Sequence, residues 1–147
     1  RFFYYTSVTN YDYLFLGVIG VLYPEDKKEF IESGRNADIK NSILLKFKED
    51  GFYLIDLSEL PLSYTTTSLV EQLPKLEKRI QELSDEDTKI ILIKSDVYDI
   101  AFSFLNNRFK NVIDVKIPFP SSGHQKSFNT KFIEALKLTD YYIINGM

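Results

Sequence analysis

Three short and nearly continuous apolar runs constrain the fold of this chain most strongly. They cover Phe52–Ile55, Ile90–Ile93 and Val112–Ile117. Runs of this length and composition are typical of strands that are buried on both faces of a parallel sheet. Segments with helical spacing of apolar residues lie between them. This alternation predicts an α/β layered domain in which right-handed helical crossovers connect parallel strands.

Apolar residues at helical spacing predict the helices between and around these runs. Pro74 either kinks the helix that contains Leu69 to Leu83 or opens its second half. Ser95 is expected to be the N-cap of the helix that contains Val97 to Leu105. Tyr13–Leu22 and Ile39–Phe47 are also predicted helices, and Arg1–Val8 is either a strand or an extended aromatic segment. The three stripes are Leu69, Leu73, Leu76, Ile80 and Leu83; Val97, Ile100, Ala101, Phe104 and Leu105; and Phe128, Phe132, Ala135 and Leu136.

The composition excludes several kinds of site. The 147 residues include no cysteine and one histidine, so disulfides and thiolate chemistry are excluded, and we expect neither a metal nor a cofactor. Eighteen basic residues against 21 acidic ones give a net charge of -3. This balance argues against broad electrostatic capture of nucleic acid or of an anionic membrane, but it leaves room for a local basic patch.

Length and hydropathy indicate one domain that spans residues 1–147. The longest apolar run, Tyr13–Tyr23, is too short to cross a bilayer and lacks the basic leader of a signal peptide. We therefore expect a cytoplasmic protein without a membrane partner.

The segment Val115–Phe128, VKIPFPSSGHQKSF, is the best candidate for a functional loop. Its two prolines stiffen the backbone, and the hydroxyls of Ser121 and Ser122 can cap a helix or contact a ligand. Gly123 allows close approach of the backbone to a ligand, and His124 is the only histidine of the chain. The alternative is that this segment is an ordinary turn that caps a helix.

The charge of this loop favours an anionic ligand. No acidic residue occurs from residue 115 to 133, whereas Lys116, Lys126 and Lys131 are basic. Lys126 lies next to Gln125, close to the expected start of a helix. A helix that begins near Ser122 would offer its free amides to a phosphate group. In a parallel sheet, ligands bind beyond the carboxyl ends of the strands, where Asp56 would also lie.

The order of segments, with GFYLIDL in the first apolar run and PFPSSG in the loop, resembles a divergent branch of the uracil-DNA glycosylase superfamily. The resemblance covers most of the chain, from Arg1 to about Leu136. It implies a three-layer αβα domain around a four-stranded parallel sheet in the order 2-1-3-4. It also implies an N-glycosyl hydrolase that flips an altered base out of DNA.

The chain departs from the pattern of that superfamily at its catalytic positions. The water-activating first motif is missing, and we expect it upstream of Arg1 if it exists. The final His-Pro-Ser-Pro motif corresponds to IPFP here, so Ile117 replaces the catalytic histidine and Phe119 replaces the serine. Asp56 stands where members of the superfamily place a base-reading asparagine, although it can equally cap the following turn.

Two functions therefore remain open, and neither assigns a catalytic residue. The first is a DNA glycosylase that recognises or excises an altered base. The second is a catalytically inactive module on the same fold that binds a nucleotide, a nucleic acid or a protein. Phe3 and Tyr4 are the best candidates for a ring that stacks on a base, although most such rings belong to the core. The candidate binding residues are Phe3, Tyr4, Asp56, Ser121, Ser122, Gly123, His124, Gln125 and Lys126.

Overall fold

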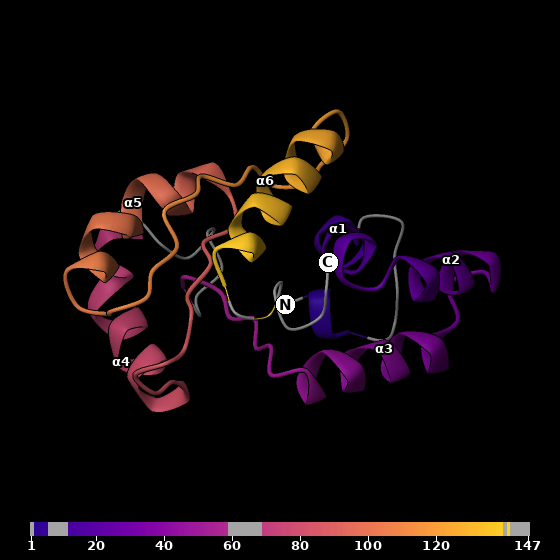
Figure 1. The fold of residues 1–147 in the computed structure, drawn as a ribbon, viewed down its shortest axis with the longest axis horizontal. Coiled ribbons are helices and arrows are strands. Elements are labelled where there is room, and N and C mark those ends of the chain that lie inside the picture. Colours follow the sequence, from indigo (N-terminus) through magenta and orange to yellow (C-terminus); the bar gives the residue numbers. More distant parts are fainter. Residues whose placement is uncertain (1, 6–11, 59–68, 140, 142–147) are drawn as a thin grey trace. The chain divides into compact units, whose positions relative to one another are not determined.

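The computed structural model describes residues 2–5, 12–58, 69–139 and 141. Their regular structure is helical, as Figure 1 shows. The helices are α1 (Tyr13–Leu22), α2 (Pro24–Glu32), α3 (Ala37–Glu49), α4 (Leu73–Leu83), α5 (Ser95–Asn106) and α6 (Gln125–Lys137), and the short 3-10 helices are η1 (Phe2–Tyr4) and η3 (Leu69–Gln72). Among the described helices none is both long enough and apolar enough to cross a membrane.

The chain divides into two compact units. The first unit comprises Arg1–Ile55 and Pro120–Asn129, and the second comprises Asp56–Phe119 and Thr130–Met147. The loop before α6 therefore belongs to the first unit, whereas two of the three apolar runs belong to the second.

The predicted α/β fold with a four-stranded parallel sheet is wrong, because the described residues form no strand and no sheet. Two of the predicted strands meet only in isolated parallel bridges, Ile90 with Val112 and Ile93 with Ile117. The bridged positions are three residues apart on one segment and five apart on the other. A ladder in one register cannot accommodate this difference. The longer segment turns locally, since Val115 donates its N–H to the carbonyl two residues earlier at 3.0 Å.

The first apolar run, Phe52–Ile55, is also not a strand. The ring of Phe52 stacks on Phe47 of α3 at 5.0 Å between centroids, and Leu54 donates its N–H to the hydroxyl of Tyr4 at 2.8 Å. This run thus contacts a helix and a side chain where a neighbouring strand was predicted. The N-terminal expectation is corrected as well, because residues 2–4 form η1; residues 6–8 lie outside the described part of the chain.

Aromatic rings build the core of the first unit. Phe3, Phe15, Phe30 and Phe47 are all buried. The ring of Phe15 lies 5.6 Å from that of Phe3 and 5.5 Å from that of Phe30, both with edge-to-face geometry, and Phe3 lies 5.1 Å from Phe47. Because α1, α2 and α3 each supply one of these rings, the cluster holds the three helices together.

The predicted helices of the second unit are confirmed, except that Leu69 lies in η3. Part of their apolar stripes supplies the core, whereas Leu83 is 50% exposed. The buried residues are Leu73, Leu76 and Ile80 of α4, Ala101 and Leu105 of α5, and Phe132, Ala135 and Leu136 of α6, together with Ile113, Val115 and Ile117. Pro74 lies in the first turn of α4, so it opens this helix and does not kink it.

The start of α5 differs from the prediction. Ser95 is the first helical residue, not the N-cap, and Lys94 takes the cap position without a side-chain hydrogen bond. Lys94 has a φ of 88°, which is uncommon for a residue with a side chain. Its N–H donates to the carbonyl of Ile117 at 2.9 Å. The bridge to the neighbouring segment thus sets the backbone here, and it overrides the local preference of serine for the cap.

Candidate functional site

The predicted loop makes a tight turn before α6 begins. The helix starts three residues after the expected start near Ser122. His124 donates its N–H to the carbonyl of Ser121 at 2.9 Å, which closes the turn. Gly123 has a φ of 86°, in the left-handed region that glycine adopts without strain. The carbonyl of His124 then accepts the first helical hydrogen bond, from Phe128 at 3.0 Å.

The base of this loop is buried, and its tip is exposed. Pro120 and Phe128 are fully buried against Gly17 of α1. A Cβ at Gly17 would lie only 2.9 Å from the Pro120 side chain and 3.1 Å from the Phe128 ring, so glycine permits this close approach. Residues 122–126 are all exposed. The loop therefore combines a fixed anchor with an accessible tip.

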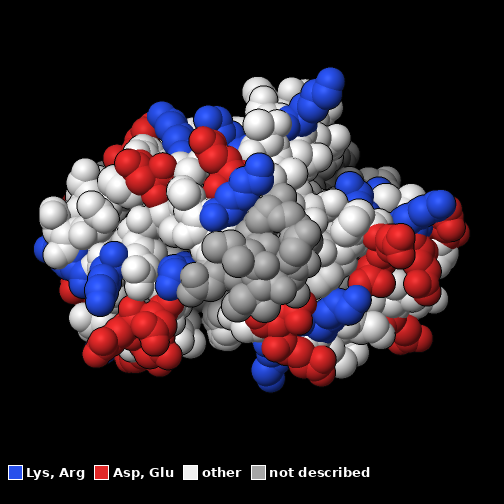
Figure 2. Space-filling model, viewed as in Figure 1, with Lys and Arg blue, Asp and Glu red and all other residues white. Residues whose placement is uncertain are grey.

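The first turn of α6 contains no acidic residue. The same is true of α1 and α4, whereas α2, α3 and α5 carry acids in their first turns. A helix start has free N–H groups and a positive dipole end, so it attracts anions where no carboxylate of its own competes. Figure 2 shows acidic and basic side chains interspersed over the visible face. Attraction of an anion would therefore be local to the loop.

The two aromatic candidates near the N-terminus lie in different environments. Phe3 is buried in the core of the first unit, with no exposed face for a ligand. Tyr4 is 41% exposed, and its hydroxyl accepts the hydrogen bond from Leu54. Burial raises the pKa of Tyr4 above its usual value, although that hydrogen bond opposes the shift. Tyr4 lies 6.5 Å from Tyr53 between ring centroids, and both rings are exposed, as is Tyr5.

Asp56 begins the second unit and is exposed. Arg79 of α4 holds this stretch of backbone, because its guanidinium donates to the carbonyls of Asp56 and Leu57, each at 2.7 Å. The loop Ser121–Lys126 belongs to the first unit. A site that joins Asp56 to this loop stays a prediction.

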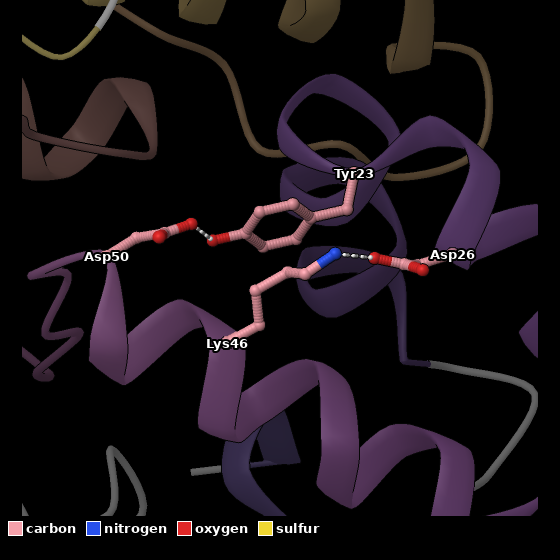
Figure 3. Close-up of polar contacts among 4 residues, drawn as sticks. All are labelled: Tyr23, Asp26, Lys46 and Asp50. Carbon is pink, nitrogen blue, oxygen red and sulfur yellow. Dashed lines mark hydrogen bonds and ion pairs between the residues drawn. The ribbon is translucent and has the colours of Figure 1, made fainter. Parts of the chain in front are cut away.

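A polar cluster in the first unit, drawn in Figure 3, is structural in character. Tyr23 donates its hydroxyl hydrogen to Asp50 at 2.6 Å, and Lys46 pairs with Asp26 at 2.7 Å. The ammonium of Lys46 also lies 5.1 Å from the centre of the Tyr23 ring. These contacts join the α1–α2 junction to α3. Each of the four polar groups already has a partner within the cluster. The cluster therefore links the helices and is not a candidate binding site.

The second unit contains a pocket that was not predicted from the sequence. It has a volume of about 260 Å³ and lies between the turn after α4 and the turn after α5. The lining residues are Ser84, Asp85, Glu86, Thr88, Ile90, Arg108, Phe109 and Lys110. The one sequence signal was that both turns carry charged residues next to an apolar one. Among the described residues, no group of three His, Asp or Glu side chains is placed to hold a metal ion.

No family model, no curated protein and no solved structure matches this chain. The resemblance to the uracil-DNA glycosylase superfamily therefore rests on the short quoted motifs alone. The α/β fold that it implied is corrected above, and the comparisons give no support to a glycosylase or DNA-repair assignment.

Proposed function

We propose that this chain is a non-catalytic binding module that contacts phosphate groups, in a nucleotide or a nucleic acid, through the loop Ser121–Lys126. The observation that carries the proposal is the exposed, acid-free tip of the loop on a buried anchor. A rigid base lowers the entropy lost when a ligand orders the contacting residues.

The chemistry of the loop suits a phosphate group. The first amides of α6 point out of the helix start, and Lys126 adds a positive charge beside them. Ser121 and Ser122 supply hydroxyl donors, and Gly123 has no side chain to block close approach of an anion. His124 and Gln125 complete the exposed tip, with side chains that can donate hydrogen bonds.

Ile117 favours binding over catalysis. The resemblance gives this position to a histidine that stabilises the departing base, but the side chain here is apolar and fully buried. Its carbonyl accepts the N–H of Lys94 at 2.9 Å, so the backbone group has a structural partner. Neither the side chain nor this carbonyl can donate a hydrogen bond to developing negative charge.

The tyrosine surface, defined as Tyr4, Tyr5 and Tyr53, favours a protein partner as a second candidate. Tyr53 is 69% exposed, and Tyr4 and Tyr5 are about half exposed. Exposed tyrosines are enriched in protein–protein interfaces, because a rigid ring covers a large area and its hydroxyl can form hydrogen bonds.

The phosphate proposal is tested by titrating the chain with three probes at several salt concentrations. The probes are a labelled single-stranded DNA, a mononucleotide and inorganic phosphate, which separate nucleic acid from smaller sources of the same group. We expect Lys126→Glu to weaken binding and to lower the salt slope for DNA by about 0.7, the value for one phosphate contact on a single strand.

Lys131→Glu is the matched control. Lys131 lies on the same helix, and it is about half exposed and paired with Glu134 at 3.3 Å. The substitution makes the same change of charge away from the loop, so binding should stay close to that of the parent. If the parent binds none of the probes at low salt, or if both variants lose affinity equally, the proposal is wrong.

A further inference from the structure

Hydrogen bonds hold the backbone that forms the pocket of the second unit. The carboxylate of Asp85 accepts the N–H of Asp87 at 2.9 Å and the hydroxyl of Thr88 at 3.1 Å. Asn111 donates its side-chain amide to the carbonyl of Glu86 at 2.8 Å, which ties this turn to the segment after α5. The Ile90–Val112 bridge joins the same two segments a few residues further on.

The charged side chains that line the pocket differ in whether they already have a partner in the protein. Arg108 is committed to the protein, since it pairs with Glu77 at 3.3 Å and lies 3.6 Å from the centre of the Phe104 ring. Within the part of the chain that the structure describes, the carboxylate of Glu86 and the ammonium of Lys110 have no hydrogen-bond or ion-pair partner. One free negative and one free positive group therefore line the same pocket.

The remaining lining adds a fixed carboxylate and an apolar surface. Hydrogen bonds from Asp87 and Thr88 lower the pKa of Asp85 below its usual value. Ile90 and Phe109 are half-buried and supply apolar contact. The volume of about 260 Å³ lies just below the range of roughly 300 to 1,000 Å³ that holds drug-sized ligands. The size suits a small metabolite better than a nucleotide.

We propose that this pocket binds a free α-amino acid with an apolar side chain. The ammonium of the ligand meets Asp85 and Glu86, its carboxylate meets Lys110, and its side chain contacts Ile90 and Phe109. Glu86 and Lys110 are exposed, so water solvates each of them when no ligand is bound. A zwitterion can contact both signs of charge in this lining, whereas a ligand with one charge can contact only one of them. The proposal concerns the second unit and does not depend on phosphate binding by the loop.

Titration of the full chain with L-leucine and L-phenylalanine, followed by calorimetry and by backbone NMR shifts, tests this proposal. We expect saturable binding in the millimolar range, with shifts at residues 84–90 and 108–110. N-acetyl-L-leucine lacks the ammonium and L-leucinamide lacks the carboxylate. Each should bind roughly tenfold more weakly than L-leucine, because each loses one charged contact.

The variant Lys110→Glu tests whether Lys110 contacts the carboxylate of the ligand or affects binding only through the net charge of the chain. The variant should bind L-leucine roughly tenfold more weakly but L-leucinamide no more weakly than the parent does, because the amide has no carboxylate to lose. Lys78→Glu, an exposed position of α4 outside the pocket, makes the same change of charge and should leave both affinities unchanged. Circular dichroism confirms that both variants are folded.

Three results would overturn the proposal. The first is no saturable response to either amino acid. The second is equal binding of L-leucine and the two blocked analogues, which would show that the charges do not contribute. The third is an unchanged affinity of Lys110→Glu for L-leucine, which would show that the carboxylate does not meet this lysine.

Discussion

At the scale of single residues, the buried ion pair of the first unit is the least ordinary feature. Lys40 has no exposed surface and Asp12 is 3% exposed, with 2.6 Å between ammonium nitrogen and carboxylate oxygen. Lys40 also lies 4.4 Å from the centre of the Phe15 ring. Burial raises the pKa of Asp12 above its usual 3.8, although the hydrogen bond and charge of Lys40 and the charge of Arg35 lower it. The cost of desolvation thus outweighs the pairing.

We predict that Lys40→Met destabilises the chain strongly and in a pH-dependent manner. Removing one partner of a buried pair costs about 3 to 5 kcal/mol, since the remaining charge loses its hydrogen-bonded partner. Because the pKa of Asp12 is raised in the folded state, the free energy of unfolding falls as the pH rises through that folded-state pKa. Without Lys40 the pKa of Asp12 rises further, so this fall is larger. The deficit relative to the parent should therefore be larger at about pH 7 than at about pH 4, as measured by urea unfolding.

Lys46→Met is the control for this prediction. Lys46 also pairs with an aspartate, Asp26, but it is 51% exposed. Loss of an exposed pair should cost less than about 1 kcal/mol at either pH. Equal deficits for the two variants, or a deficit of Lys40→Met that does not depend on pH, would contradict the role assigned to the buried pair.

At the scale of elements, α1 carries two glycines with opposite surroundings. A Cβ at Gly17 would meet the side chain of Pro120, which is buried and rigid, at 2.9 Å. A Cβ at Gly20 would meet the end of the Lys27 side chain at the same distance, and that side chain can move aside. Helix α1 thus requires glycine at Gly17, where the loop packs against it, but not at Gly20.

We predict that Gly17→Ala destabilises the chain and Gly20→Ala does not. Alanine gains roughly 0.8 to 1.0 kcal/mol over glycine within a helix, and Gly20→Ala should keep much of this gain. At Gly17, crowding of the core costs about 1 to 3 kcal/mol, which exceeds the gain. Urea unfolding of both variants measures the difference. Stabilisation by Gly17→Ala would show that Pro120 and Phe128 do not anchor the loop on α1.

At the scale of the whole molecule, we predict that this chain releases no uracil from single- or double-stranded DNA. Ile117 stands at the position that the resemblance gives to a catalytic histidine, and the first motif is missing from the 147 residues. An incision assay with an active glycosylase as the positive control measures this. Robust release that survives Ile117→Ala but vanishes with Asp56→Ala would place catalysis at Asp56.

The sequence allowed the helices to be predicted because their signals are local. Leu73, Leu76 and Ile80 recur at helical spacing, and they form the buried face of α4. The exposed loop before α6 could be proposed for the same reason, since its proline, serine and glycine residues are adjacent along the chain. The pocket could not be found, because its lining comes from residues 84–90 and 108–110, which only the tertiary structure brings together.

By itself, the sequence determined where most of the helices lie, since their apolar faces follow from residue spacing within a few turns. It did not predict α2, which is short and mostly charged. Only the tertiary structure decided the state of the apolar runs. An isolated run of branched residues favours extended backbone, but a strand exists only if another segment pairs with it in register. Ile90 and Ile93 meet Val112 and Ile117 with unequal spacing, so the two segments pair through two bridges and form no sheet. Leu92, Ile113, Val115 and Ile117 of these segments are nevertheless buried.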